Sequence, residues 1–126
     1  ENGMSRYEEG LKMIEEMCGN NKDNVISLAT ISTELSADGK PIPTVRDVDA
    51  YYEDGVFYVV TYFKSNHMQH ILKTKEVGFA VHYEGFSGTG KSEKLGWVLD
   101  PKNAEMRTKI RKVFDDWYDV ANNEQD

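Results

Sequence analysis

The stretch VISLATIST, residues 25–33, decides the fold, because it is rich in the β-branched residues that favour strands. The turn signal Ala37-Asp38-Gly39-Lys40-Pro41 follows it and leads into a second predicted strand over Ile42–Tyr52. Glu53-Asp54-Gly55 then predicts a hairpin turn into a third strand over Val56–Tyr62. The middle of the chain is therefore expected to form antiparallel β structure.

Helices are predicted at both ends of this β region. Ser5 and Glu8 have the spacing of a capping box, and the helix that they open is expected to stop at Gly19. A short helix over Ser65–Thr74 precedes a further strand over Gly78–Tyr83. A C-terminal amphipathic helix begins at Asp100-Pro101, and its apolar stripe is Met106, Ile110, Val113, Phe114, Trp117 and Ala121. Helices at the ends and strands between them, without βα alternation, predict an α+β fold around an antiparallel sheet or small barrel.

Length and composition limit the class of protein. A chain of 126 residues with 39% hydrophobic residues predicts one domain, residues 1–126, in which residues 1–3 look like an expression remnant. The net charge of −7 argues against binding to a nucleic-acid backbone but is compatible with one small anionic ligand. Cys18 is the one cysteine, so no internal disulfide can form. With no apolar run long enough to cross a membrane, a cytoplasmic location is expected.

One motif resembles a nucleotide-binding loop. Residues 85–92, GFSGTGKS, match the phosphate-binding pattern GxxxxGK[ST]. Such a loop must feed a helix whose N-terminus faces the phosphates, but Gly96 and Asp100-Pro101 follow too soon for that helix. We therefore interpret the stretch as a glycine-rich strand or loop, which makes a nucleotide hydrolase using Lys91 the weakest functional hypothesis.

Several short segments, in order, resemble the pyridoxamine 5'-phosphate oxidase-like family of FMN-binding split barrels, and a small, poorly characterised bacterial branch in particular. The similarity covers about residues 25–118. The family has a lysine where this chain has His67. The segments that carry the resemblance are Leu28-Ala29-Thr30, Asp38-Gly39-Lys40-Pro41, Arg46-Asp47-Val48-Asp49, Phe57–Thr61, Ser65-Asn66-His67, Val77–Tyr83, Gly90–Leu95, Leu95-Gly96-Trp97 and Asp116-Trp117-Tyr118.

The resemblance implies an antiparallel split β-barrel with flanking N-terminal and C-terminal helices. It further implies a homodimeric flavoprotein with FMN at the subunit interface, and flavin-dependent oxidoreductase activity on a small-molecule substrate. By position, the phosphate would be bound by Arg46, Ser65, Asn66 and His67. The backbones of Asp47, Val48, Asp49, Val60 and Thr61 would border the flavin ring. The resemblance assigns no catalytic residue.

The residues themselves leave alternatives open. Arg46 offers a planar fork for phosphate oxygens, yet a lone arginine on a strand is more often a solvated charge. Ser65 is also an ordinary helix N-cap. His67 and His70 could share a helix face, but without a CxxC or HExxH motif no metal site is predicted. The functional alternatives are a split-barrel dimer that binds another ligand, such as haem, and a non-catalytic flavin-binding relative.

Overall fold

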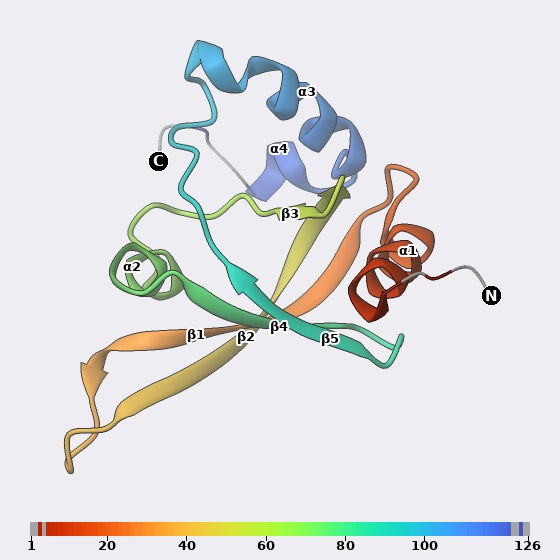
Figure 1. The fold of residues 1–126 in the computed structure, drawn as a ribbon. Helices are drawn as coiled ribbons and strands as arrows, with labels where there is room; N and C mark the ends of the chain where they lie inside the picture. The colour runs from red at the N-terminus through yellow and green to blue at the C-terminus, as the bar shows by residue number, and fades with distance from the viewer. Residues whose placement is uncertain (1–2, 4, 122–123, 125–126) are drawn as a thin grey trace.

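A five-stranded antiparallel sheet forms the centre of the molecule. The computed structural model describes Gly3, residues 5–121 and Glu124. Neighbouring strands pair antiparallel in the order β3-β2-β1-β4-β5, and the sheet curls into a half-barrel (Figure 1). The strands are β1 (Asn24–Leu35), β2 (Pro41–Glu53), β3 (Val56–Tyr58), β4 (Glu76–Val81) and β5 (Phe86–Lys91). With helices on either side of it in the sequence, this sheet confirms the predicted α+β class.

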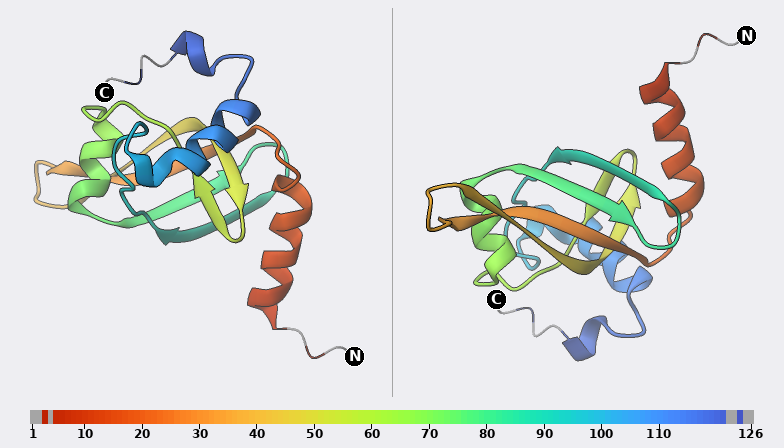
Figure 2. Two further views of the ribbon diagram at one scale, coloured as in Figure 1. Left: turned by 90° about the horizontal axis from the view of Figure 1, so that it is seen from above. Right: turned by 90° about the horizontal axis from the view of Figure 1, so that it is seen from below.

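The N-terminal helix α1 (Arg6–Cys18) begins with the predicted capping box. Ser5 Oγ accepts from the Glu8 backbone N–H at 3.1 Å, and Glu8 Oε1 accepts from the Ser5 N–H at 2.9 Å. The helix ends at Gly19, where an added Cβ would lie 2.6 Å from the Glu15 carbonyl oxygen. The close approach of these two residues therefore selects glycine. The N-terminal half of α1 extends away from the sheet (Figure 2).

The other helices are α2 (Asn66–Lys73), the short 3₁₀ turn η1 (Pro101–Asn103), α3 (Ala104–Val113) and α4 (Tyr118–Ala121). The prediction of a single C-terminal helix is wrong in one respect, because α3 ends at Val113 and a separate helix, α4, begins at Tyr118. The break allows Phe114 to stack on Trp117 and lets Tyr118 turn inwards, where it is buried. None of the described helices has the length and apolar character needed to span a membrane.

Two apolar clusters hold these layers together. The first joins α1 to the sheet through Ile14, Cys18, Ile26, Ala50, Tyr52 and Val81. The second joins β2 to the C-terminal helices through Tyr51, Ile110, Phe114 and Tyr118. Tyr51 and Tyr52 are neighbours in β2 and therefore point to opposite faces of that strand, so each cluster takes one of them.

Aromatic rings form a continuous row across the sheet. Tyr52, Phe57, Phe79 and Phe86 come from β2, β3, β4 and β5, with successive ring centroids 5.2, 5.3 and 6.3 Å apart. Gly88 makes room for this row, because an added Cβ would lie 3.0 Å from the Phe79 ring. The stretch 85–92 therefore contributes strand β5, which pairs with β4 over its whole length, and its interpretation as a glycine-rich strand is confirmed.

Two strand predictions were too long at their C-terminal ends. The third strand stops at Tyr58, and residues 59–62 leave the ladder because no described strand runs beside them. The fourth strand stops at Val81, and Tyr83 takes a left-handed conformation with φ of 65° in the turn before β5. β-branched residues thus indicate strand character, but a strand also needs a neighbour with which to pair.

Candidate functional site

A cleft of about 1400 Å³ opens between the half-barrel and the C-terminal helices. The aromatic residues Phe57, Phe79 and Phe86 of the sheet line one wall, and Met106 and Ile110 of α3 line another. Thr61 and His67 lie at the end of the cleft near α2. Of the residues predicted to bind a phosphate, His67 lines the cleft, whereas Arg46, Ser65 and Asn66 are not among its lining residues.

Arg46 is held in place on β2 by two hydrogen bonds. Its Nη1 donates to the Leu28 carbonyl oxygen at 2.9 Å, and its Nη2 donates to Thr44 Oγ1 at 2.7 Å. Burial lowers the pKa of the guanidinium, which remains cationic at working pH. No ion pair joins Arg46 to a carboxylate of the described residues, so its charge is not neutralised there.

The start of α2 gathers two hydroxyl groups and an imidazole. Ser65 is the N-cap, and its Oγ accepts from the Met68 backbone N–H at 3.2 Å. Thr61 Oγ1 lies 3.2 Å from Ser65 Oγ and 2.7 Å from His67 Nε2. The partial positive charge of a helix N-terminus faces this cluster, and such a position favours an anion.

The charge of Arg46 acts on both histidines of α2. Burial lowers the pKa of His67, and the positive charges of Arg46 and His70 lower it further. His67 is therefore neutral at neutral pH in the ligand-free protein. Arg46 and His67 come from β2 and α2, which are well separated in the sequence, and the fold brings them to one place.

The remaining predicted residues occupy different environments. Asn66 is exposed at the first position of α2. Val48 packs in the α1 cluster, and Val60 packs against the C-terminal helices. Asp47 points away from Arg46 and contacts Ser27 and His82, at 2.8 and 3.0 Å. Burial and the neighbouring Asp23 raise the pKa of Asp49, so neither aspartate side chain joins the Arg46 cluster.

Sequence reasoning missed a polar layer beneath the site. Thr30 Oγ1 lies 2.8 Å from His70 Nδ1, and Thr44 Oγ1 lies 3.3 Å from the same atom. Both Thr30 and His70 are buried. Thr44 precedes Arg46 by two residues and therefore lies on the same face of the strand. This spacing is visible in the sequence and could have indicated that Thr44 contacts Arg46. This layer supports the hydroxyl that holds Arg46.

A metal centre finds little support in the described part of the chain, where no three His, Cys, Asp or Glu side chains gather as potential ligands. His67 and His70 each use one ring nitrogen for a threonine. No protein-family model, curated protein sequence or solved structure matches this chain. The fold and site together define an antiparallel half-barrel with an apolar cleft, and Thr61, Ser65 and His67 cluster at the start of α2 near one end of that cleft.

Proposed function

We propose that the protein is a homodimeric FMN-binding flavoprotein and acts as an oxidoreductase on a small molecule. The observation that carries the proposal is the cluster of Thr61, Ser65 and His67 at the N-terminus of α2, together with Arg46 of β2, whose charge acts on His67. A phosphate monoester needs cations and N–H or O–H donors, and these groups supply both kinds.

Each of these residues has a distinct part in binding the phosphate. Arg46 provides a permanent charge whose orientation is already fixed by Leu28 and Thr44. Ser65 and Asn66 stand at the helix start, where backbone N–H groups point outwards. His67 becomes a second cation when a nearby phosphate favours its protonation. The donor set therefore fits the phosphate of FMN.

The apolar cleft suits the flavin ring. Residues 59–62 lie outside the strand ladder, and all four line the cleft beside the Phe57 and Phe79 rings. In the proposal the backbones of Val60 and Thr61 border the bound ring from the cleft wall. Those of Asp47, Val48 and Asp49 border it from β2, although these three residues do not line the cleft. Bound flavin would supply hydride transfer, while these residues hold the ring and exclude water from one face.

The open side of the half-barrel supports the homodimer. β5 is an edge strand, and among the described residues no further strand pairs with its outer edge. Tyr62, Phe63, Leu95 and Trp97 are exposed at the rim of the cleft. A second copy across this opening would cover apolar surface and close the cofactor site.

The second candidate, a barrel that binds haem or another ligand, depends on His67 in place of the expected lysine. A neutral imidazole is a good metal ligand, but Thr61 occupies the Nε2 atom of His67. Only the Nδ1 atom would then be available to iron. This contact is the reason why we place the flavin first.

The proposal is tested by titrating the purified protein with FMN, riboflavin and haemin in parallel. FMN fluorescence should be quenched with saturation at one flavin per chain, and the complex should show flavin absorption bands after gel filtration. A Soret band with haemin and no FMN binding would favour the second candidate. FMN that never co-elutes, in any redox state, would refute the flavin proposal.

A further inference from the structure

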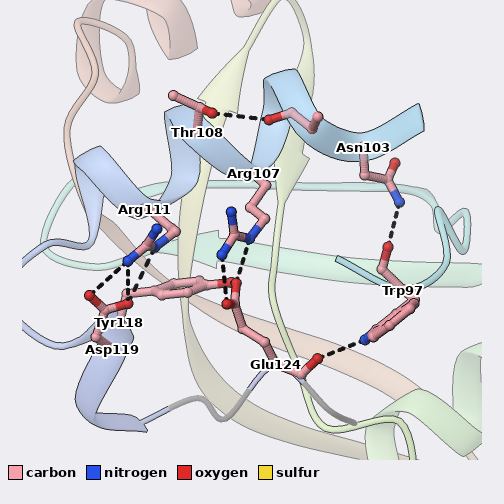
Figure 3. A network of polar contacts seen from close by, with 9 residues as sticks. Trp97, Asn103, Arg107, Thr108, Arg111, Tyr118, Asp119 and Glu124 are labelled. Carbon is pink, nitrogen blue, oxygen red and sulfur yellow. Dashed lines mark hydrogen bonds and ion pairs between the residues drawn. The ribbon is translucent and has the colours of Figure 1, made fainter. Parts of the chain in front are cut away.

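Two side chains from separate helices converge on the carboxylate of Glu124, and a third side chain binds its backbone oxygen (Figure 3). Arg107 of α3 donates to both carboxylate oxygens, each at 2.6 Å, through Nε and Nη2. The Tyr118 hydroxyl of α4 donates to Oε2 at 2.9 Å. Trp97 Nε1 donates to the Glu124 backbone oxygen at 2.7 Å. Glu124 belongs to no helix or strand and has φ of 61°.

The contact lies inside the cleft. Arg107, Tyr118 and Glu124 all line it, opposite the strands of the half-barrel. In a chain with a net charge of −7, the cleft lining has three basic residues, Lys91, Lys94 and Arg107, and only two acidic ones, Glu93 and Glu124. Without the Glu124 carboxylate, this surface would be distinctly cationic.

A neighbouring ion pair offers a direct contrast. Arg111 and Asp119 also come from α3 and α4: Arg111 Nη2 donates to both Asp119 carboxylate oxygens at 2.9 Å, and Nε donates to one of them at 3.3 Å. Their side chains are 41% and 71% exposed, and neither residue lines the cleft. The side chains of Arg107 and Glu124 are 27% and 19% exposed. Of these two ion pairs, only Arg107–Glu124 therefore places a carboxylate in a partly buried pocket.

We propose that Arg107 and Tyr118 form a carboxylate-binding subsite of the cleft, which the chain's own Glu124 occupies as an internal competitor. The ligand is a small organic acid whose carboxylate takes the place of the Glu124 side chain. The planar guanidinium fork matches a carboxylate in two parallel hydrogen bonds, and the tyrosine hydroxyl adds a third. This subsite is defined without reference to the flavin.

The charge states agree with recognition of an ionised acid. Arg107 lowers the pKa of Glu124, so that side chain is a carboxylate at neutral pH. Burial and the nearby carboxylate raise the pKa of Tyr118 to about 12, so the phenol keeps its proton and donates. An amide of the same shape would present an N–H group to these donors and would bind poorly.

The surroundings indicate an acid with an apolar body. Met106 and Ile110 line the same wall of the cleft, one and three residues from Arg107 on α3, and Trp97 lies on the loop before it. Benzoate is therefore a suitable probe, and benzamide is its uncharged control. The proposal predicts weak benzoate binding to the wild type, because a tethered competitor is present at a high effective concentration.

The experiment measures benzoate binding by calorimetry to the wild type and to Glu124→Ala. Removal of the internal carboxylate should tighten benzoate binding by about tenfold or more, in line with the millimolar effective concentration of a short tether. Benzamide should show no gain. Asp119→Ala is the matched control, since it removes the neighbouring ion pair outside the cleft and should leave benzoate binding unchanged. Glu124→Gln, which keeps the shape of the side chain, serves as a second release variant.

Addition of Arg107→Gln to Glu124→Ala should abolish the gain in benzoate affinity. Thermal unfolding of each variant identifies any that has lost its fold. If Glu124→Ala does not fold, Glu124→Gln takes its place. Three results would overturn the subsite: no gain in either folded release variant, an equal gain in Asp119→Ala, or a gain that survives Arg107→Gln. Because no flavin is added, these results are independent of the outcome of the FMN titration.

Discussion

The Oγ1 atom of Thr61 lies 2.7 Å from Nε2 of His67, and this contact ties the wall of the cleft to the first turn of α2. The same hydroxyl lies 3.2 Å from Ser65 Oγ. A phosphate at the helix start would therefore meet groups that are already held in one cluster, next to the charge of Arg46. Such preorganisation lowers the entropy lost on binding.

FMN affinity should depend on pH through His67. Burial and Arg46 place the pKa of free His67 below its usual value, so the imidazole is neutral at pH 7.5. A phosphate dianion favours the imidazolium, and binding then takes up a proton. FMN affinity should therefore rise as the pH falls from about 8.5 to about 6.5, by at most about tenfold per unit. Fluorescence titrations across this range measure the slope.

Two substitutions separate charge from shape at this position. His67→Lys should bind FMN more tightly than the wild type at pH 8 and should lose the pH slope, because its cation is permanent. His67→Gln should also lose the slope but bind more weakly. A wild-type affinity that stays flat over this range would show that His67 does not contact the phosphate.

Asp49 and Asp47, on the same face of β2, should have opposite effects on stability. Burial and Asp23 raise the pKa of Asp49 to about 6, whereas hydrogen bonds from Ser27 and His82 lower the pKa of Asp47. The native state thus holds the Asp49 proton more tightly than the unfolded chain does. This group therefore makes stability fall as the pH rises from about 4 to about 6.

Asp49→Asn should accordingly raise the unfolding midpoint at pH 7.5 and change it much less at pH 4. Asp47→Asn should lower the midpoint at pH 7.5, since the stabilising effect of a depressed pKa is present above about pH 4 and lost below it. Thermal unfolding of both variants and of the wild type at pH 7.5 and pH 4 gives the four changes in midpoint. Destabilisation by Asp49→Asn at pH 7.5 would contradict the account of the Asp23 pair.

Gly88 should tolerate a side chain less well than Gly90. A Cβ at Gly88 would lie 3.0 Å from the Phe79 ring, whereas nothing lies within 4 Å of a Cβ at Gly90. Gly88→Ala should cost about 1–3 kcal/mol of unfolding free energy, as overpacking usually does. Gly90→Ala should be near neutral. Urea denaturation compares the two, and equal effects would show that the aromatic row can shift freely.

Assembly should be visible in solution without any ligand. The open half-barrel and the exposed rim residues of the cleft predict a dimer, so light scattering at micromolar concentration should give about twice 14.4 kDa. Trp97→Glu would place a charge on the rim and should shift the protein towards monomer. A wild-type monomer at that concentration would remove the subunit interface from the proposed function.

Local signals made much of the fold predictable. The Ser5–Glu8 capping box and the Asp54-Gly55 turn, with φ of 50° and 83°, are set by neighbouring residues and appear as predicted. The ends of elements depend on distant partners. Residues 59–62 have strand composition but no described neighbouring strand, and Phe114 ends α3 where its ring meets Trp117.

The candidate site was predictable only in part for the same reason. Ser65 and His67 are close in sequence, so their cluster could be proposed from a motif. The approach of Arg46 to His67 and the contact between Thr30 and His70 join residues far apart in the chain, and only the fold brings them together. The carboxylate held by Arg107 has no sequence signal at all, because Glu124 follows the last helix without a motif.

The most direct test of the central claim is the affinity difference between FMN and riboflavin in the wild type and in Arg46→Ala. The two ligands differ only by the phosphate, so their difference isolates the proposed site. Loss of a charge-assisted contact costs about 1.5–3 kcal/mol, or roughly ten- to a hundredfold in affinity. We predict that Arg46→Ala weakens FMN binding by that factor and leaves riboflavin binding unchanged. If FMN affinity stays within about twofold of the wild type, or if both ligands weaken equally, Arg46 does not bind the phosphate.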